Sequence, residues 1–171
     1  MAAWSGMRNK LENEYLAQSL RGRIQYYCTS YTQSADQNGR ASIRLDGKEL
    51  ISGCYWNMYG KARLFPHDDK YEQRMRWGLS IVDETALKLG VFDESSFYRA
   101  FYVFDNQSIE KSLCSDNLLV RIFAVLDRRV GKRRLRQMRD SLKEEDEIFN
   151  LFYVIRADAE HILDKSKNPN R

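Results

Sequence analysis

The stretch ASIRLDGKELISGCYW, residues 41–56, constrains the fold of this chain more than any other. Its central Asp46-Gly47 pair is typical of a two-residue type I′ turn, which joins antiparallel strands and requires a positive φ angle at the glycine. Counting outward from the turn gives three cross-strand pairs: Leu45 with Lys48, Arg44 with Glu49, and Ile43 with Leu50. The middle pair joins opposite charges and the outer pair is apolar, so the two faces of the hairpin differ consistently. The stretch therefore predicts an antiparallel hairpin.

Two segments before the hairpin extend this prediction. Residues 6–20 repeat apolar side chains at helical spacing, which predicts a helix. Residues 23–31, RIQYYCTSY, are rich in aromatic and β-branched side chains and predict a strand. The polar segment that follows is predicted to form a tight turn at Asn38-Gly39. We therefore expect a helix followed by a three-stranded antiparallel meander.

The rest of the chain is predicted to be mostly helical after a loop over residues 57–68. Apolar periodicity gives helices over about 71–89, 93–104, 108–114, 116–129, 132–142 and 145–163. The fold class is α+β: an N-terminal helix, a three-stranded antiparallel meander, then a mostly helical C-terminal half packed on it. We expect residues 1–171 to form a single domain, with a helix-plus-sheet part (1–60), a helical part (68–163) and a flexible tail (164–171).

Composition and cysteine usage indicate a soluble cytoplasmic protein. Hydrophobic residues make up 43% and charged residues 30% of the 171 residues, which is ordinary for a globular chain. No apolar run is long enough to span a membrane, and the N-terminal sequence lacks the apolar core of a signal peptide. Cys28, Cys54 and Cys114 are widely spaced, so we expect buried thiols rather than disulfides or a zinc site.

No cofactor, metal site or catalytic residue is predicted. The sequence VGKRRL has the Gly-Lys pair of a phosphate-binding loop without the loop glycines or the Ser or Thr, and WGLSIV lacks the second glycine of a nucleophile elbow. His67 beside Asp68 and Asp69 could join a metal site or act as a base, but these acids are more typical of the start of the next helix. The sequence leans against an enzyme without deciding the matter.

A group of strand and loop aromatics has two interpretations. They could form a base-stacking surface, as in proteins that bind single-stranded nucleic acid. They could equally fill the space between sheet and helices, and we favour this second interpretation. The group comprises Tyr26, Tyr27, Tyr31, Tyr55, Trp56 and Tyr59.

The strongest functional signal is LDRRVGKRRLRQMRD, residues 126–140. Seven basic side chains lie between Arg128 and Arg139 with no acid among them. The preceding helix is apolar almost all round, which indicates burial, and Gly131 is expected to change the chain direction. The next helix has a narrow apolar stripe formed by Leu135, Met138 and Leu142. The candidate anion- or nucleic-acid-binding residues are Lys132, Arg133, Arg136 and Arg139.

Arg129 differs from its basic neighbours. On a helical wheel it falls inside the apolar arc of the helix predicted over 116–129, unlike Arg121 and Arg128. A buried guanidinium needs a carboxylate or several carbonyl partners. We therefore predict that Arg129 is mostly buried and paired, with a structural role, as for Gly47 and Gly131.

Two interpretations of the basic segment remain open. In the first, which we favour, the basic side chains pair within the molecule with the acidic run that follows, Glu144–Glu147. Cations near the C-terminus of one helix and anions near the N-terminus of the next also suit the two helix dipoles. In the second, the basic helix binds RNA, DNA or an acidic protein. Alignment with a helix-turn-helix motif fails, because Asp127, Lys132 and Gln137 would fall at positions that require small or apolar residues.

Several stretches resemble a family of uncharacterised bacterial proteins of about this length. They are WSGMRNKLE, LRGRIQY, DQNGRASIRLDGKE and SDNLLVRIFAVLDRRVGKRRL, and they match in order over nearly the whole chain. The resemblance implies a bacterial, cytoplasmic protein and no particular activity.

The residues themselves lead to a prediction of a non-enzymatic protein that binds a protein partner or itself. The alternative is nucleic-acid binding through the basic helix over residues 128–139, and a second alternative is an enzyme with no recognisable motif. No membrane partner is expected.

Overall fold

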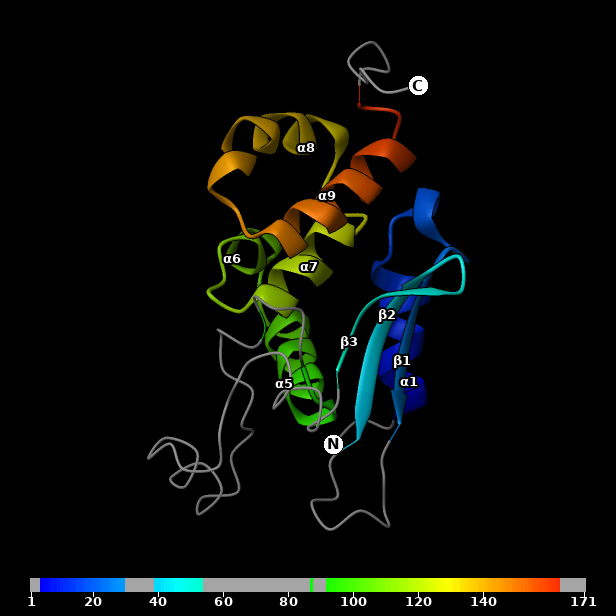
Figure 1. The fold of residues 1–171 in the computed structure, drawn as a ribbon. Helices are drawn as coiled ribbons and strands as arrows, with labels where there is room; N and C mark the ends of the chain where they lie inside the picture. The colour runs from blue at the N-terminus through cyan, green and yellow to red at the C-terminus, as the bar shows by residue number, and fades with distance from the viewer. Residues whose placement is uncertain (1–3, 30–38, 54–86, 88–91, 164–171) are drawn as a thin grey trace.

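The computed structural model describes residues 4–29, 39–53, 87 and 92–163 (Figure 1). The chain starts with helix α1 (Trp4–Asn9), which continues as a π-helix (Lys10–Tyr15) and is followed by a 3-10 turn (Gln18–Leu20). The predicted N-terminal helix is therefore present, in three consecutive helical forms. Strands β1 (Ile24–Thr29), β2 (Arg40–Leu45) and β3 (Lys48–Gly53) form an antiparallel sheet in the order β1-β2-β3, which confirms the meander.

The hairpin turn between β2 and β3 has the predicted backbone. Asp46 has a φ angle of 50° and Gly47 one of 82°, as a type I′ turn requires. The predicted pairs of Leu45 with Lys48 and of Arg44 with Glu49 are confirmed. The predicted pair of Ile43 with Leu50 is wrong, because a β-bulge shifts the register there and Ile43 pairs with Ile51 instead.

The C-terminal half consists of helices, as predicted. They are α5 (Glu94–Asp105), α6 (Ile109–Leu113), α7 (Leu118–Leu126), α8 (Lys132–Met138), a 3-10 helix (Arg139–Glu144) and α9 (Glu147–Ala159). Side chains cap the first three: Asp93, Ser108 and Asn117 accept hydrogen bonds from backbone N–H groups of the first turns of α5, α6 and α7. The α+β class is confirmed.

The sheet and the helices share one hydrophobic core. Helix α7 lies at its centre, with α5, α6 and α9 packed around it and the sheet beside them (Figure 1). Every residue of α7 except Arg121 is buried, which confirms the helix predicted to be apolar nearly all round. The Tyr26 ring of β1 meets Phe97 of α5 and Phe123 of α7, at centroid distances of 6.1 and 5.8 Å.

The aromatic residues of β1 follow the core-filling interpretation only in part. Tyr26 is buried, whereas Tyr27 is exposed and lies under the Arg44 guanidinium, 4.7 Å from its ring centroid. The other four aromatics of that group, together with His67, Cys54, most of the helix predicted over 71–89 and the tail, lie outside the described residues. The single domain and its internal boundaries stay a prediction. Within the described residues, no helix combines the length and the apolar character needed to cross a membrane.

Candidate functional site

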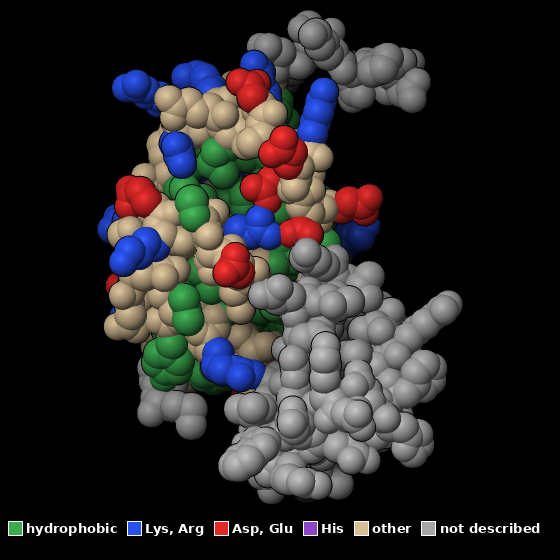
Figure 2. All heavy atoms as spheres, turned by 90° about the vertical axis from the view of Figure 1, so that its left-hand side faces the viewer, with side chains coloured by type: hydrophobic (Ala, Val, Ile, Leu, Met, Phe, Trp, Pro, Cys, Tyr) green, Lys and Arg blue, Asp and Glu red, His purple; other side chains and the backbone are tan. Residues whose placement is uncertain are grey.

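Helix α8 presents a basic surface to solvent. Its Leu135 is buried, and Met138 and Leu142 pack against the core, which confirms the predicted apolar stripe. We call the exposed basic side chains on and beside this helix the basic face: Arg128, Lys132, Arg133, Arg134, Arg136 and Arg139. Figure 2 shows Lys and Arg side chains gathered at the upper end of the molecule, where Figure 1 places α8.

Most of the basic face has no partner within the described chain. Lys132 forms an ion pair with Glu160, with 3.5 Å between Nζ and Oε2. Arg139 also has an interaction partner. The guanidinium groups of Arg128, Arg133, Arg134 and Arg136 form no hydrogen bond or ion pair with any residue that the structure describes. Four arginines are therefore available to a ligand.

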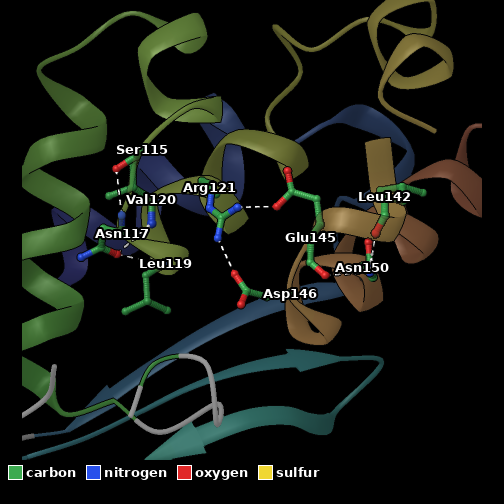
Figure 3. Close-up of polar contacts among 9 residues, drawn as sticks. All are labelled: Ser115, Asn117, Leu119, Val120, Arg121, Leu142, Glu145, Asp146 and Asn150. Carbon is green, nitrogen blue, oxygen red and sulfur yellow. Dashed lines mark hydrogen bonds and ion pairs between the residues drawn. The ribbon is translucent and has the colours of Figure 1, made fainter. Parts of the chain in front are cut away.

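The acidic run after the basic segment is engaged elsewhere. Arg121 of α7 donates to Glu145 through Nη1 and to Asp146 through Nη2, the latter at 2.5 Å (Figure 3). Its side chain is only 15% exposed, and its guanidinium lies 5.3 Å from the Phe149 ring centroid. The favoured interpretation, in which the basic segment pairs with Glu144–Glu147, is therefore wrong for the four unpaired arginines. The ion-pair partner of Glu145 and Asp146, two of the four acids in this run, is Arg121 of α7.

A hollow of about 490 Å³ lies beside this ion pair. Its lining is mainly acidic and consists of Leu113, Cys114, Ser115, Asp116, Arg121, Glu144, Glu145 and Asp146. Cys114 is exposed, contrary to the expectation of a buried thiol, whereas Cys28 is buried, and that burial raises the pKa of its thiol to about 12. Among the described residues, no side chain hydrogen-bonds the Cys114 thiol, and no group of three His, Cys, Asp or Glu side chains is placed to hold a metal ion.

Arg129 is paired but not buried. Its Nε and Nη2 atoms donate to Asp127 Oδ2 at 3.0 and 2.7 Å, and its guanidinium lies 5.0 Å from the Tyr15 ring centroid. The side chain is 40% exposed, so the prediction that it is mostly buried is wrong. The helical wheel does not apply to Arg129, because α7 ends at Leu126 and residues 127–130 form a turn.

Gly131 begins α8 as its N-cap residue. Its φ and ψ angles of −77° and 165° are extended, and a Cβ atom there would contact nothing within 4 Å. The change of chain direction occurs where it was predicted, but it does not require glycine.

Two polar side chains of α9 form hydrogen bonds with backbone carbonyl groups in α8 and in the turn just before it. The Tyr153 hydroxyl donates to the carbonyl oxygen of Leu135 at 2.7 Å, and Arg156 donates to the carbonyl oxygen of Val130 at 3.2 Å. Both side chains are buried, and burial lowers the pKa of the Arg156 guanidinium. Neither residue was predicted from the sequence, although the position of Arg156 gives one signal. Arg156 follows Phe149 and Phe152 by seven and four residues, which places it on the apolar face of its helix.

Comparison with known proteins gives one match. The model of a family described as the SF0329 protein family matches residues 3–157. Neither a curated protein nor a solved structure matches the chain.

Proposed function

The chain belongs to the SF0329 protein family, and we propose that it binds nucleic acid through the basic face of α8. The observation that carries this proposal is the set of four exposed arginines, Arg128, Arg133, Arg134 and Arg136, which have no partner among the described residues. A guanidinium presents several donors in a rigid fork that matches the oxygens of a phosphate. Arginines that form no ion pair with a carboxylate of the described residues are available to bind a phosphate group.

The distribution of charge supports a polyanionic partner. Residues 128–143 carry eight basic side chains and one acidic side chain, a net charge of +7, whereas the whole chain carries +4. All other residues together therefore carry −3. Because the net positive charge is concentrated in this segment while the rest of the chain is slightly acidic, a polyanion would be attracted preferentially to α8.

The contacts expected on this surface are with phosphates. On a helical wheel Arg133 lies roughly opposite the buried Leu135 and Arg136 lies about 100° from it, and both side chains are exposed to solvent. Contacts with the phosphate backbone position a protein on nucleic acid but do not read its sequence. The proposed activity is therefore binding with little sequence preference. A bacterial cytoplasm, the setting that the sequence resemblance implies, is rich in both DNA and RNA.

Protein binding, the function favoured from sequence alone, would require an exposed apolar patch. Among the described residues, the large exposed aliphatic side chains are Val103, Leu151 and Val154, of which only Leu151 and Val154 share a helix, at 40% and 46% exposure. A pair of this size is ordinary for a protein surface. The unpaired arginines favour nucleic acid over a protein partner.

The proposal is tested by fluorescence anisotropy with short labelled duplexes and single strands of mixed sequence, at about 50 mM salt, where phosphate contacts are strong. The variant Arg133→Glu/Arg136→Glu reverses two outward-pointing charges of the basic face. The control Lys48→Glu/Lys111→Glu makes the same change in net charge at two exposed lysines of the hairpin turn and α6.

We expect binding by the unmodified protein and by the control, and none by the arginine variant. Equal loss in the two variants would mean that net charge rather than the basic face governs binding. Failure of the unmodified protein to bind any of the probes would overturn the proposal. Anionic lipid vesicles serve as a further probe, and preferential binding to them would identify a membrane surface instead.

A further inference from the structure

Although Lys, Arg, Leu, Gln and Met each favour a helix, the length, the charges and the N-cap of α8 reduce its stability. It has seven residues, and helices much shorter than about a dozen residues are marginal in water without tertiary contacts. Lys132, Arg133 and Arg134 occupy its first turn, where the helix dipole disfavours cations. Arg136 lies four and three residues after Lys132 and Arg133, so like charges repel along the exposed face. Its N-cap is Gly131, which supplies no side-chain cap.

The contacts that stabilise α8 therefore come from outside the helix. Leu135 is its one buried residue. The Leu135 carbonyl oxygen is free to accept the Tyr153 hydroxyl because the helix tightens at its end, where the Arg139 N–H donates to the Arg136 carbonyl instead. Just before the helix, Arg156 donates to the carbonyl of Val130.

Arg156 is itself held in place by other parts of the chain. Its guanidinium donates to Ser19 at 3.0 Å and pairs with Glu160 at 2.7 Å, and Glu160 also pairs with Lys132 at the start of α8. Its side chain is only 4% exposed, which leaves no access for a ligand. The Tyr153 and Arg156 contacts thus join α8 to elements that belong to the core.

We propose that Tyr153 and Arg156 are positioning residues for the basic face: they hold α8 as a helix, and they do not touch the ligand. This inference rests on the proposed function for its effect on binding, but its structural part can be tested without nucleic acid. When α8 is helical, Arg133 and Arg136 project together. When α8 opens, the same charges are dispersed over a flexible segment, and the apparent affinity is the intrinsic affinity multiplied by the fraction of molecules in which α8 is helical.

The test begins with Tyr153→Phe, which removes one hydroxyl and keeps the buried ring. Hydrogen exchange of residues 132–138 should become about fivefold faster, since a hydrogen bond contributes about 1 kcal/mol net and 1.4 kcal/mol corresponds to a factor of ten. Exchange in α7 should not change. Tyr27→Phe is the matched control, because it removes an exposed hydroxyl from β1.

A rescue variant separates the order of α8 from other effects. Gly131→Ser supplies a side-chain cap at a backbone geometry that suits one, with open space around its Cβ, and leaves the charge unchanged. Added to Tyr153→Phe, it should slow the exchange of α8 again. Affinity for a mixed-sequence duplex should fall in Tyr153→Phe by the factor by which the helical fraction of α8 falls, at most about fivefold. It should recover in part in the double variant, because serine is only a slightly better N-cap than glycine.

The outcomes distinguish the two proposals. Unchanged exchange of α8 in Tyr153→Phe overturns the positioning role, whatever the binding result. An unchanged affinity in a variant whose exchange shows that α8 is open in a large fraction of molecules also overturns it, because α8 order would then be irrelevant to binding. If the unmodified protein binds no nucleic acid, the proposed function fails, and the exchange and rescue measurements alone decide whether Tyr153 positions α8.

Discussion

Arg121 of α7 donates to Asp146, which precedes α9, at 2.5 Å across 25 residues of sequence. This contact, together with the contact from Arg121 to Glu145, satisfies two carboxylates that follow the basic segment directly. Because these carboxylates are engaged by α7, they are not the partners of the arginines on α8. Among the described residues, Arg133, Arg134 and Arg136 of α8 have no ion-pair partner.

Replacing Arg121 should destabilise the fold. Arg121→Gln leaves Glu145 and Asp146 side by side and mostly buried, with their charges uncompensated. We expect a loss of about 1–3 kcal/mol in the free energy of unfolding, less than for a fully buried pair because both carboxylates reach solvent. Urea denaturation measures it. Arg133→Gln is the control, and it should stay within about 0.5 kcal/mol of the unmodified protein because Arg133 is exposed and has no partner among the described residues. An equal effect of the two substitutions would contradict the assignment of the ion pair.

The hairpin turn gives a prediction that depends on backbone geometry alone. Gly47 has a φ angle of 82°, which a β-branched residue adopts only under strain. Gly47→Val should destabilise by about 1–3 kcal/mol, measured as a shift of the thermal unfolding midpoint. Gly6→Ala is the matched control: Gly6 lies within α1, a Cβ there meets nothing within 4 Å, and alanine favours a helix by up to about 1 kcal/mol. An unchanged midpoint for Gly47→Val would mean that the turn is not type I′.

The ionisation of Glu49 should make the stability of the fold depend on pH in the acidic range. Hydrogen bonds from Arg40 and then from Arg44 lower the pKa of its carboxyl from 4.5 to about 2, against the opposing effect of burial. A lowered folded-state pKa contributes stability that is fully present above pH 4.5 and is lost as the pH falls towards 2. Glu49→Gln should therefore be less stable at neutral pH, by on the order of 1 kcal/mol once solvent screening is allowed for. The difference should disappear near pH 2. A constant difference in unfolding free energy over the whole range would show that ionisation of Glu49 is not the cause.

The features that could be predicted from the sequence depend on residues close together along the chain. The type I′ turn at Asp46-Gly47 and the apolar stripe around Leu135 follow from spacings of a few residues, and both are confirmed. The pairing of Ile43 failed because a bulge inserts one residue, and no local pattern marks it.

The candidate site was predicted only in part, because its decisive contacts are distant in sequence. The roles of two arginines were exchanged: Arg129 lies beyond the end of α7 and is substantially exposed, whereas Arg121 is the shielded, paired cation. An acidic run such as Glu144–Glu147 requires a cation, but its sequence does not indicate which one. Tyr153, 18 residues from its acceptor, gave no sequence signal of its role at all.

The salt dependence of nucleic-acid affinity tests the central claim most directly. If the basic face engages about four phosphates of duplex DNA, the logarithm of the association constant should fall with the logarithm of the salt concentration with a slope of about −3.6. Affinity should then decrease by roughly two orders of magnitude between about 50 and 200 mM salt. Arg133→Gln/Arg136→Gln should reduce the slope to about −1.8, since each phosphate contact contributes about −0.9, and should leave folding intact. A slope near zero, or the same slope for the double variant as for the unmodified protein, would contradict phosphate binding by the basic face.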